Sequence, residues 1–560
     1  MAGDMHQPVG AGQPRYASLD AETLCGAFQV TAAERPQQVA HRAFGGGLEF
    51  TYAEFAARVR ALAEGLHSLG VRRGDTVALM LTNRPEFNLV DVAALHLGAT
   101  PYSVYNTLSP EQINQLFANS GNRVVVTEQQ FLPRVLEART ADVEHVVLVD
   151  AAGHGFLTLD DLARSHVRGF DFDAAWRAVA PDDVATLIYT SGTTGPSKAT
   201  QLTHGGIMFE ARALAAALAI GPGGRLISYL PSAHVGDRGM SHYCCSLCYG
   251  TTLVSLADLK QLPAALAEVR PTLFGGVPRV WEKLKAGLEA AGLREPAKLP
   301  DAGKALVRAR LGLDQSTLQV TSAAPASREV LQYFLDLGLP LNEAWGMSEL
   351  SCFATMNPPH EIRLGTVGKA LPGVELKLLD DGELLVRAPL VMKGYRNDPE
   401  RTAEALDADG WLHSGDVAEI DGDGYVHIVD RKKELIINSA GKNMSPANIE
   451  LALRAASPLI AHAVCIGDRR PYNVALLVLD RELLAKAAGG ETPSPEALRN
   501  ALAAAVEAAN ARLSRVEQIK RFAVVAADWA PGGDELTPTL KLKRKPIHAK
   551  YAAEIERLYS

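Results

Sequence analysis

"VATLIYTSGTTGPSK" (residues 184–198) joins an apolar run to a loop of small and hydroxyl-bearing residues that ends on Lys198. The β-branched and apolar residues of 184–190 predict a buried strand. The loop residues let backbone N–H groups approach an anion closely, while hydroxyls and Lys198 add donors and positive charge. The loop residues are Thr190, Ser191, Gly192, Thr193, Thr194 and Gly195. We therefore predict a phosphate-binding loop at the end of a strand.

The spacing of this loop excludes one common type of phosphate site. A Walker A loop has the pattern G-x-x-x-x-G-K-[ST]. Here Gly192, Gly195 and Lys198 follow one another at three-residue steps, and Ala199 stands where the last hydroxyl belongs. A P-loop kinase or ATPase is therefore disfavoured. A flexible Gly/Thr linker is the other alternative, but the strand before the loop and the helical pattern at 203–220 are unlike a linker.

Outward from the loop, helical and strand-like segments alternate. Residues 51–70 predict a helix, because Thr51 and Glu54 form a capping-box pattern and Gly70 provides a stop. Buried strands are expected at 75–81, 123–128, 145–150 and 185–190. This alternation indicates an α/β fold with doubly wound sheets.

The texture of the sequence changes towards the C-terminus. From about residue 365 to 430, short strands and turns predict a β-rich subdomain, including hairpins in "VELKLLDDGELLVRA" and "EIDGDGYVHIVD". Residues 431–560 again mix strands and helices and predict a small α+β domain. We expect a large domain over 1–430 and place the main boundary at Asp430 to Lys433.

Composition limits the function. The chain has 560 residues, 47% of them hydrophobic, and a net charge of -8, which gives no support to nucleic-acid binding. No apolar run approaches the ~20 residues of a membrane span, and the N-terminus lacks a signal-peptide pattern, so we expect a cytoplasmic protein. One cluster of possible zinc ligands stands close together in the sequence: His242, Cys244, Cys245 and Cys248. Because a closed zinc site usually needs a second chelating pair, which is not seen elsewhere in the sequence, we predict that these residues pack in the core.

The loop resembles the T-S-G-T-T-G-x-P-K-G signature of the adenylate-forming superfamily, which includes acyl-CoA synthetases, luciferases and peptide-synthetase adenylation domains. Pro196 and Ser197 appear in swapped order, and Ala199 replaces the last glycine. The resemblance implies that the loop binds ATP phosphates, with Thr193 helping to hold Mg²⁺. It extends over about residues 20 to 555, because further family segments follow in order.

Two of these segments imply nucleotide contacts in the large domain. "NEAWGMSEL" (342–350) is similar to the family's x-x-Y-G-x-T-E segment, in which Trp345 would stack on adenine and Glu349 would ligate Mg²⁺. Gly346 and Ser348 belong to the same segment. "SAAP" (322–325) resembles the turn that lines the adenine. The residues implied by that turn are Ala323 and Ala324.

The remaining segments lie at the domain boundary and beyond it. "GWLHSGDVAEIDGDGYVHIVDRKKELI" (410–436) is the longest match, and it implies that Asp416 binds the ribose hydroxyls, Arg431 contacts the nucleotide and Lys433 is the hinge. Taken alone, it is also a hairpin with a solvated basic end. "SAGKNMSPANIE" (439–450) is similar to the segment that faces CoA, with Gly441 and Lys442. "LTPTLKLKRKPI" (536–547) puts Lys541 at the catalytic lysine position, after Leu540, where many relatives have glycine.

The substrate class is implied by two more phrases. "YLPSAHVGDR" (229–238) and "VRPTLFGGVPRVWEKL" (269–284) resemble segments of long-chain fatty acyl-CoA synthetases, in which His234 lies by the acyl pocket. Some of those enzymes have a gating tryptophan four residues later, where this chain has Arg238. The implied reaction is ATP-dependent activation of a fatty acid to acyl-AMP, then transfer to CoA, with Mg²⁺ as cofactor and a mobile small domain.

Two alternatives remain open at this point. A fatty acyl-AMP ligase that loads a carrier protein would share every nucleotide motif, and a non-catalytic nucleotide-binding paralogue would share most of them. Retention of Lys541, Glu349 and Asp416 together speaks against the paralogue. The expected partners are fatty acid, ATP and CoA, with no nucleic acid; peripheral membrane contact through the substrate and a homodimer are left open.

Overall fold

The computed structural model describes residues 16–150, 155–190, 197–218, 220–438, 443–487, 494–537 and 540–560. Within these residues the largest sheet has eight strands in the order β19-β9-β8-β4-β3-β5-β6-β7. From β8 to β7 all neighbours are parallel, whereas β8–β9 and β9–β19 are antiparallel. The strands are β3 (Thr76–Met80), β4 (Thr100–Ser103), β5 (Val124–Thr127), β6 (His145–Leu148), β7 (Leu157–Thr158), β8 (Val184–Thr190), β9 (Lys198–Thr203) and β19 (Gly394–Tyr395).

Helices cover both faces of this sheet, as the sequence pattern predicts. Along β3, Val77 and Leu79 join the large central hydrophobic cluster, while Ala78 and Met80 join a second cluster built with α4. This is the two-faced burial of a doubly wound sheet. The helices of this half are α1 (Leu24–Glu34), α2 (Tyr52–Ser68), α3 (Pro85–Leu95), α4 (Pro110–Ser120), α5 (Leu132–Glu137), α6 (Leu159–Arg164), α7 (Phe172–Arg177) and α8 (His204–Leu218).

Two local predictions can be compared directly with these elements. The capping box at Thr51 is confirmed, because its hydroxyl accepts the Glu54 N–H and the Glu54 carboxylate accepts the Thr51 N–H. The expectation that a helix follows the phosphate loop is incomplete. Strand β9 intervenes before α8 and pairs antiparallel with β8. The short "KATQLT" run has mixed polarity, and β9 is held between β8 and the edge strand β19.

Two further sheets complete the large domain. One has the order β10-β11-β1-β2 and the other β12-β13-β14-β15-β16. Their strands are β1 (Val39–Ala43), β2 (Glu49–Thr51), β10 (Arg225–Ser228), β11 (Thr252–Ser255), β12 (Leu273–Gly276), β13 (Leu318–Thr321), β14 (Leu341–Trp345), β15 (Thr355–Met356) and β16 (Lys369–Ala370). Their helices are η3 (Gly236–Cys248, a π-helix), α9 (Leu262–Val269), α10 (Pro278–Ala290), α11 (Asp301–Leu311) and α12 (Arg328–Asp336).

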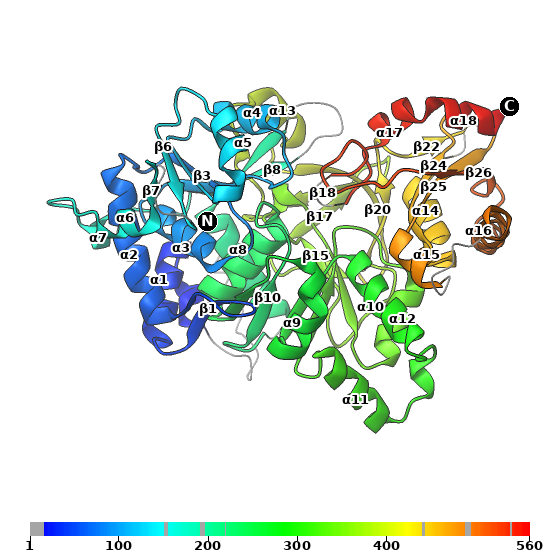
Figure 1. The fold of residues 1–560 in the computed structure, drawn as a ribbon, viewed down its shortest axis with the longest axis horizontal. Coiled ribbons are helices and arrows are strands. Elements are labelled where there is room, and N and C mark those ends of the chain that lie inside the picture. The colour runs from blue at the N-terminus through cyan, green and yellow to red at the C-terminus, as the bar shows by residue number, and fades with distance from the viewer. Residues whose placement is uncertain are drawn as a thin grey trace.

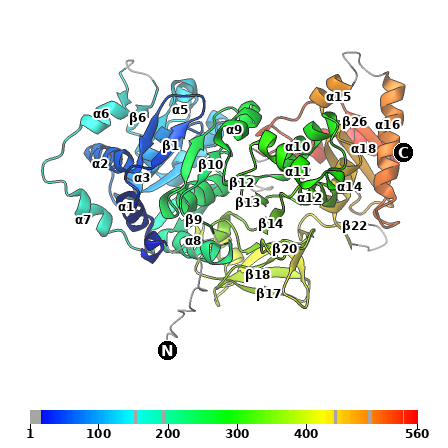
Figure 2. The same ribbon diagram turned by 90° about the horizontal axis from the view of Figure 1, so that it is seen from below.

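The predicted β-rich segment forms a four-stranded antiparallel sheet, in the order β17-β18-β20-β21. Both predicted hairpins are present, β17 (Glu375–Leu378) with β18 (Glu383–Arg387) and β20 (Leu412–Ile420) with β21 (Val426–Arg431). Helix α13 (Pro399–Ala405) precedes β20. Figure 2 shows this sheet below the large domain.

The smaller C-terminal domain has a sheet of its own, β24-β25-β26. Alternate residues of β24 enter different hydrophobic clusters, with Ala463 and Cys465 in one and Val464 and Ile466 in the other. Its elements are β22 (Ile436–Ile437), β23 (Asn443–Met444), β24 (Ile460–Ile466), β25 (Asn473–Leu479), β26 (Ile519–Val525), α14 (Pro446–Ala456), α15 (Arg481–Ala487), α16 (Pro495–Asn510), α17 (Arg544–Lys550) and α18 (Ala552–Tyr559).

The small domain lies against α10 and α12 of the large domain, as both views show (Figures 1 and 2). Ion pairs cross this contact: Arg279 pairs with Asp480 at 2.6 Å, and Arg454 pairs with Glu282 at 3.2 Å. Among the described residues, no helix combines the length and apolar character needed to cross a membrane. The contact between the two domains thus includes charged side chains.

Candidate functional site

The strand ends that hold the phosphate loop are ordered by cross-strand pairing. Thr190, at the end of β8, stands opposite Lys198, at the start of β9. This register brings both ends of the loop together and leaves Lys198 partly buried. Several predicted residues lie outside the described part of the chain: Ser191, Gly192, Thr193, Thr194, Gly195, Gly441 and Lys442.

The end of β14 carries the second predicted segment into a tightly packed turn. Trp345 is the last residue of β14, and Ser348 and Glu349 begin a single 3₁₀ turn. A Cβ on Gly346 would lie 1.9 Å from the Cys352 carbonyl oxygen, so only glycine fits there. Glu349 is 7% exposed. The backbone approach at Gly346 therefore fixes the direction in which the Glu349 side chain leaves the sheet.

The turn at 322–325 has an unusual backbone. Ala323 has φ 75°, in the left-handed region that disfavours residues with a Cβ. Ala323 is partly buried and Ala324 is exposed. Strained non-glycine residues concentrate at functional sites, where surrounding structure holds them in place. This turn is thus a candidate ligand-lining element on geometric grounds as well.

Asp416 and Arg431 stand opposite each other on the antiparallel strands β20 and β21. The Trp345 indole N–H donates to Asp416 Oδ2 at 2.7 Å, and Arg431 Nε lies 3.3 Å from Asp416 Oδ1. Asp416 Oδ1 is buried and has no hydrogen-bond partner among the described residues. Burial raises the pKa of Asp416, while Arg431, Trp345 and Lys541 oppose the rise. One carboxylate oxygen is therefore held by Trp345, while the other faces Arg431 and lacks a hydrogen bond among the described residues.

Glu349 is fixed by a residue that the sequence analysis did not single out. The Tyr395 hydroxyl donates to Glu349 Oε1 at 2.8 Å, and Lys198 Nζ lies 4.5 Å from the centre of the Tyr395 ring. Tyr395 belongs to "GYRNDPE" (394–400), a turn-like segment in which only the glycine next to the tyrosine could have pointed to a functional residue. Its role depends on contacts with β9 and β14, which are distant in sequence, so no local pattern could have identified it.

Lys541 comes from the small domain and faces the same carboxylates. It keeps a solvent-exposed side, yet the protein around its ammonium group lowers its pKa, and the charge of Arg431 lowers it further. Asp416 and Glu349 act in the opposite direction. Lys541 is therefore within electrostatic range of both carboxylates. In the sequence it stands 125 residues after Asp416 and 192 residues after Glu349.

His234 lies at the same place. Its Nδ1 accepts the Gly236 N–H at 3.1 Å. Burial lowers the pKa of His234 to about 4, and the positive charge of Lys541 contributes. His234 is therefore a neutral imidazole within electrostatic range of the Lys541 ammonium.

The boundary segment contacts both domains. Asp430 Oδ2 accepts from the Ser445 hydroxyl at 2.6 Å and from the Ala447 N–H at 3.1 Å, both at the start of α14. Lys432 pairs with Asp381 and Glu383 in the large domain, at 2.5 and 2.9 Å. Lys433, the predicted hinge residue, is exposed. The chain thus changes from one domain's contacts to the other's within a few residues.

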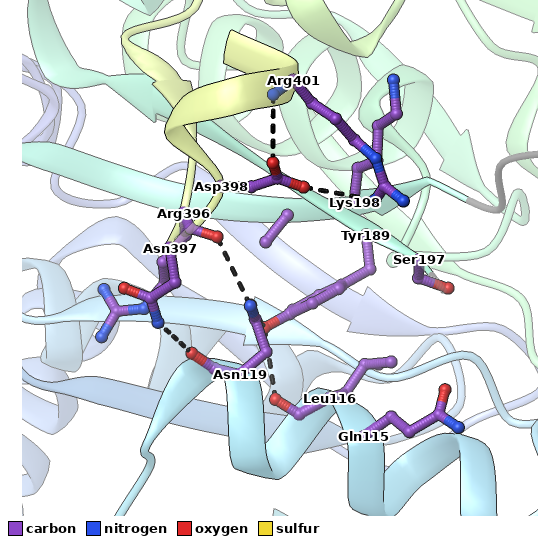
Figure 3. A pocket seen from close by; sticks show the side chains of 11 residues that line it. Gln115, Leu116, Asn119, Tyr189, Ser197, Lys198, Arg396, Asn397, Asp398 and Arg401 are labelled. Atoms are coloured by element: carbon purple, nitrogen blue, oxygen red, sulfur yellow. Dashed lines mark hydrogen bonds and ion pairs between the residues drawn. The ribbon is translucent and has the colours of Figure 1, made fainter. Parts of the chain in front are cut away.

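A cavity of about 130 Å³ borders the phosphate-loop end of β9 (Figure 3). Its cationic side chains are Lys198, Arg396 and Arg401, and its carboxylate, Asp398, pairs with Arg401 at 3.2 Å. The other lining residues are Gln115, Leu116, Asn119, Tyr189, Ser197, Ala199 and Asn397. Positive charge therefore predominates on the wall that Lys198 shares.

The cysteine cluster lies elsewhere. Cys244, Cys245 and Cys248 are fully or almost fully buried on η3 and belong to the large central hydrophobic cluster. His242 instead contacts Asn88 at 2.9 Å and Asp91 at 3.3 Å. These contacts make the segment part of the core of the large domain.

Comparison with known proteins gives a family for almost the whole chain. Residues 28–396 match the model described as AMP-binding enzyme, and residues 433–560 match the AMP-binding enzyme C-terminal domain. The long-chain-fatty-acid–CoA ligase FadD15 of Mycobacterium tuberculosis is 35% identical over 560 aligned positions, covering 91% of this chain and 92% of the relative. A second protein of that organism, with the provisional name fatty-acid–CoA ligase fadD11, is 49% identical over 451 positions, covering 72% and 79%.

Solved structures share the fold. The adenylation and carrier didomain of carboxylic acid reductase from Segniliparus rugosus, in complex with AMP, has a TM-score of 0.80 at 20% identity, covering 99% of this chain and 85% of that chain. The anthranilate CoA ligase AuaEII with anthranoyl-AMP has a TM-score of 0.78 at 19% identity, covering 95% and 98%. At these identities the likeness bears on the fold alone.

Proposed function

This chain belongs to the family of AMP-binding enzymes, and from that premise we propose that it is a fatty acid–CoA ligase that forms AMP. It joins a fatty acid to ATP, giving acyl-AMP and pyrophosphate, and then transfers the acyl group to CoA with release of AMP. The names of the relatives support a fatty acid as substrate and CoA as acceptor.

The observation that carries the proposal is the meeting of Lys541 with Asp416 and Glu349. A cation from the small domain lies within electrostatic range of two carboxylates of the large domain. Adenylate formation needs such an arrangement, because two anions must approach each other and negative charge grows on the α-phosphate. The contact between domains therefore matches the charge pattern of the first half-reaction.

The residues of the chain divide this task. Asp416 Oδ1, which lacks a hydrogen bond among the described residues, accepts from a ribose hydroxyl, while Trp345 fixes the other oxygen. The fatty acid carboxylate attacks the α-phosphorus, the bond to pyrophosphate breaks, and Lys541 compensates the charge on carboxylate and phosphate. We propose that neutral His234 lies beside that carboxylate, where the apolar part of the substrate begins; its lowered pKa, caused by burial and by the charge of Lys541, supports this.

The residues present fit a magnesium ion. The Glu349 carboxylate accepts one hydrogen bond among the described residues, from Tyr395. Carboxylate oxygens are ligands that Mg²⁺ prefers. We propose that Glu349, with Thr193, holds the ion. Bound there, Mg²⁺ would neutralise the phosphates of ATP and ease departure of pyrophosphate.

The second half-reaction requires a different arrangement of the small domain. We propose that rotation at Lys433 withdraws Lys541 and brings the segment with Gly441 and Lys442 to the acyl-AMP, so that the CoA thiol attacks the acyl carbon and AMP leaves. The domain limits stay as proposed, 1–430 and 431–560. We also propose a cytoplasmic location, with membrane contact made only through the substrate and a homodimer as the form to test.

The experiment is ATP–pyrophosphate exchange with acids from acetate to long-chain fatty acids and aryl acids. We expect exchange that depends on the acid, is strongest for medium to long aliphatic chains, and leads to acyl-CoA and AMP when CoA is added. Exchange without thioester formation, but with loading of a phosphopantetheine carrier, would identify the carrier-protein ligase. No exchange with any acid would contradict the proposal, and release of ADP would point to a kinase.

A further inference from the structure

Tyr395 lies between two groups of opposite charge that the proposed reaction uses. It is 6% exposed, on β19. Its hydroxyl donates to Glu349 Oε1 at 2.8 Å, and its ring faces Lys198 Nζ at 4.5 Å from the ring centre. One side chain thus contacts both the proposed metal ligand and the lysine of the phosphate loop.

The backbone around Tyr395 is bonded to the Glu349 turn. The Met392 N–H donates to the Glu349 carbonyl oxygen at 2.8 Å, and the Ser351 hydroxyl donates to the Leu390 carbonyl oxygen at 2.7 Å. The Tyr395 N–H donates to Thr402 Oγ1 at 2.9 Å. Because both backbones are fixed to each other, the phenol and the carboxylate keep their relative position.

The phenol is a neutral donor. A tyrosine side chain carries an O–H group at physiological pH, and in Tyr395 this group donates to Glu349 Oε1. A neutral donor orients the carboxylate and leaves its negative charge intact, whereas a lysine or arginine in the same place would neutralise that charge.

Glu349 and Lys198 carry opposite charges and both contact Tyr395, so without Tyr395 we expect them to form an ion pair with each other. Among the described residues, neither forms an ion pair of its own. The cavity beside Lys198 offers no better partner, because Arg396 and Arg401 repel it and Asp398 is already engaged by Arg401 (Figure 3). The Tyr395 ring attracts the ammonium by its quadrupole and leaves the positive charge intact.

We propose that Tyr395 is a positioning residue that keeps Glu349 and Lys198 apart, the carboxylate ready for the divalent cation and the ammonium ready for the triphosphate of ATP. This inference rests on the proposed function, since it gives Glu349 and Lys198 the ligands assigned above. It adds a residue from a segment that none of the nucleotide motifs includes.

The test compares Tyr395→Phe with Tyr333→Phe. Tyr333 is a similarly buried tyrosine on α12, away from the site; its ring also faces a lysine ammonium, that of Lys285, and its hydroxyl donates to the Leu293 carbonyl oxygen at 2.7 Å. In ATP–pyrophosphate exchange, we expect Tyr395→Phe to raise the Mg²⁺ concentration for half-maximal rate about tenfold, the size of effect typical for a residue that orients a metal ligand. The rate at saturating Mg²⁺ should return close to that of the parent protein, and Tyr333→Phe should change neither value.

A binding measurement separates failure of this inference from failure of the proposed function. ATP is titrated calorimetrically into the protein without fatty acid, at a series of Mg²⁺ concentrations. We expect the Mg²⁺ dependence of the ATP Kd to shift about tenfold in Tyr395→Phe, and Tyr395→Leu, which also lacks the ring, to weaken ATP binding at saturating Mg²⁺. An unchanged Mg²⁺ dependence in Tyr395→Phe would overturn the inference, even if exchange is normal. A shift in binding without exchange in the parent protein would uphold it and reject the proposed reaction.

Discussion

Two groups of charged residues in this molecule are built in opposite ways. Around Arg238, in the core of the large domain, every charge is enclosed: Arg238 has no exposed surface, pairs with Asp91, and donates to the Ser103 hydroxyl at 2.6 Å and the Tyr243 hydroxyl at 3.0 Å. Around Lys541, charges come from two domains, Lys541 is exposed, and Arg431 is half exposed.

The difference teaches how a structural charge can be told from a functional one. Arg238 has its charge neutralised inside the protein, which fixes η3 against α3 and leaves nothing for a ligand. Lys541, Asp416 and Glu349 attract one another without forming a closed pair, so a substrate can complete the set. Arg238 occupies the position, four residues after His234, at which some long-chain enzymes have a gating tryptophan. In this protein that position is part of the core of the large domain.

Breaking the enclosed group should have the largest effect on stability. Arg238→Ala leaves Asp91 buried without its cation, which we expect to lower the free energy of unfolding by about 3–5 kcal/mol. Urea denaturation measures the change. The double variant Arg238→Met/Asp91→Leu should recover much of the loss, because it removes both charges. A stable, unaffected Arg238→Ala would show that the enclosed group does not hold the core together.

Breaking the open group should affect activity and leave stability unchanged. Lys541→Ala should reduce acyl-AMP formation by a few hundredfold, about 3–4 kcal/mol in the barrier, because a charge that stabilises the transition state is lost. Conversion of supplied acyl-AMP with CoA should persist. Lys545→Ala, an exposed lysine of the same tail, is the control. Equal loss of both half-reactions in Lys541→Ala would contradict the assignment.

Glu210 gives an intermediate case, a buried acid without a described cation partner. Its carboxylate accepts the Phe353 N–H at 2.8 Å, and burial raises its pKa to about 8. Between the ordinary carboxyl pKa and pH 8 the folded state holds a proton that the unfolded state releases, so stability falls with rising pH by at most ~1.4 kcal/mol per pH unit. Glu210→Gln should flatten this fall in denaturation curves from pH 5 to 8. An identical slope in both proteins would mean that Glu210 is not protonated in the fold.

A smaller effect should separate stacking from orientation at Trp345. Trp345→Phe keeps an aromatic ring and loses the N–H that holds Asp416, which we expect to weaken AMP binding about tenfold, or ~1.4 kcal/mol. Calorimetry with AMP measures it. Trp281→Phe, whose indole N–H donates to the Val320 carbonyl oxygen at 3.3 Å, should leave AMP binding unchanged. Full affinity in Trp345→Phe would limit the role of Trp345 to its ring.

The smallest effect concerns the backbone just before Lys541. Leu540 has φ 64°, so its Cβ is strained, and it is 37% exposed. Leu540→Gly should stabilise the protein by about 0.5 kcal/mol, because relief of a strained Cβ exceeds the entropy that glycine adds to the unfolded chain. Leu542→Gly, which removes a side chain packed on the small domain's core, should instead destabilise it. Lower stability in Leu540→Gly would show that the leucine side chain contributes more than its backbone strain.

The sequence predicts what is local and periodic. The capping box of α2, both β-rich hairpins and the α/β alternation are confirmed, because caps, turns and hydrophobic periods are encoded by neighbouring residues. The spacing of the motifs also indicates which residues to look for near a nucleotide. The roles of the individual site residues remain predictions.

Contacts between distant strands could not be predicted in the same way. Strand β9 was missed because six residues with mixed polarity gain their stability from pairing with β8, not from their own pattern. The Trp345–Asp416 and Tyr395–Glu349 hydrogen bonds join segments 71 and 46 residues apart, and only the assembled sheets bring them together. The enclosed position of Arg238 likewise depends on α3, far upstream.

The burial of all six cysteines has a practical consequence for testing the proposed domain rotation. Burial raises the pKa of the thiols, for example that of Cys248 to about 12, so the reactive thiolate is scarce. A maleimide dye should therefore leave the native thiols unmodified while the protein is folded. Two cysteines introduced on the surface, one on each domain, could then carry a fluorescent donor and acceptor, and single-molecule traces would count the small-domain movements in each catalytic cycle.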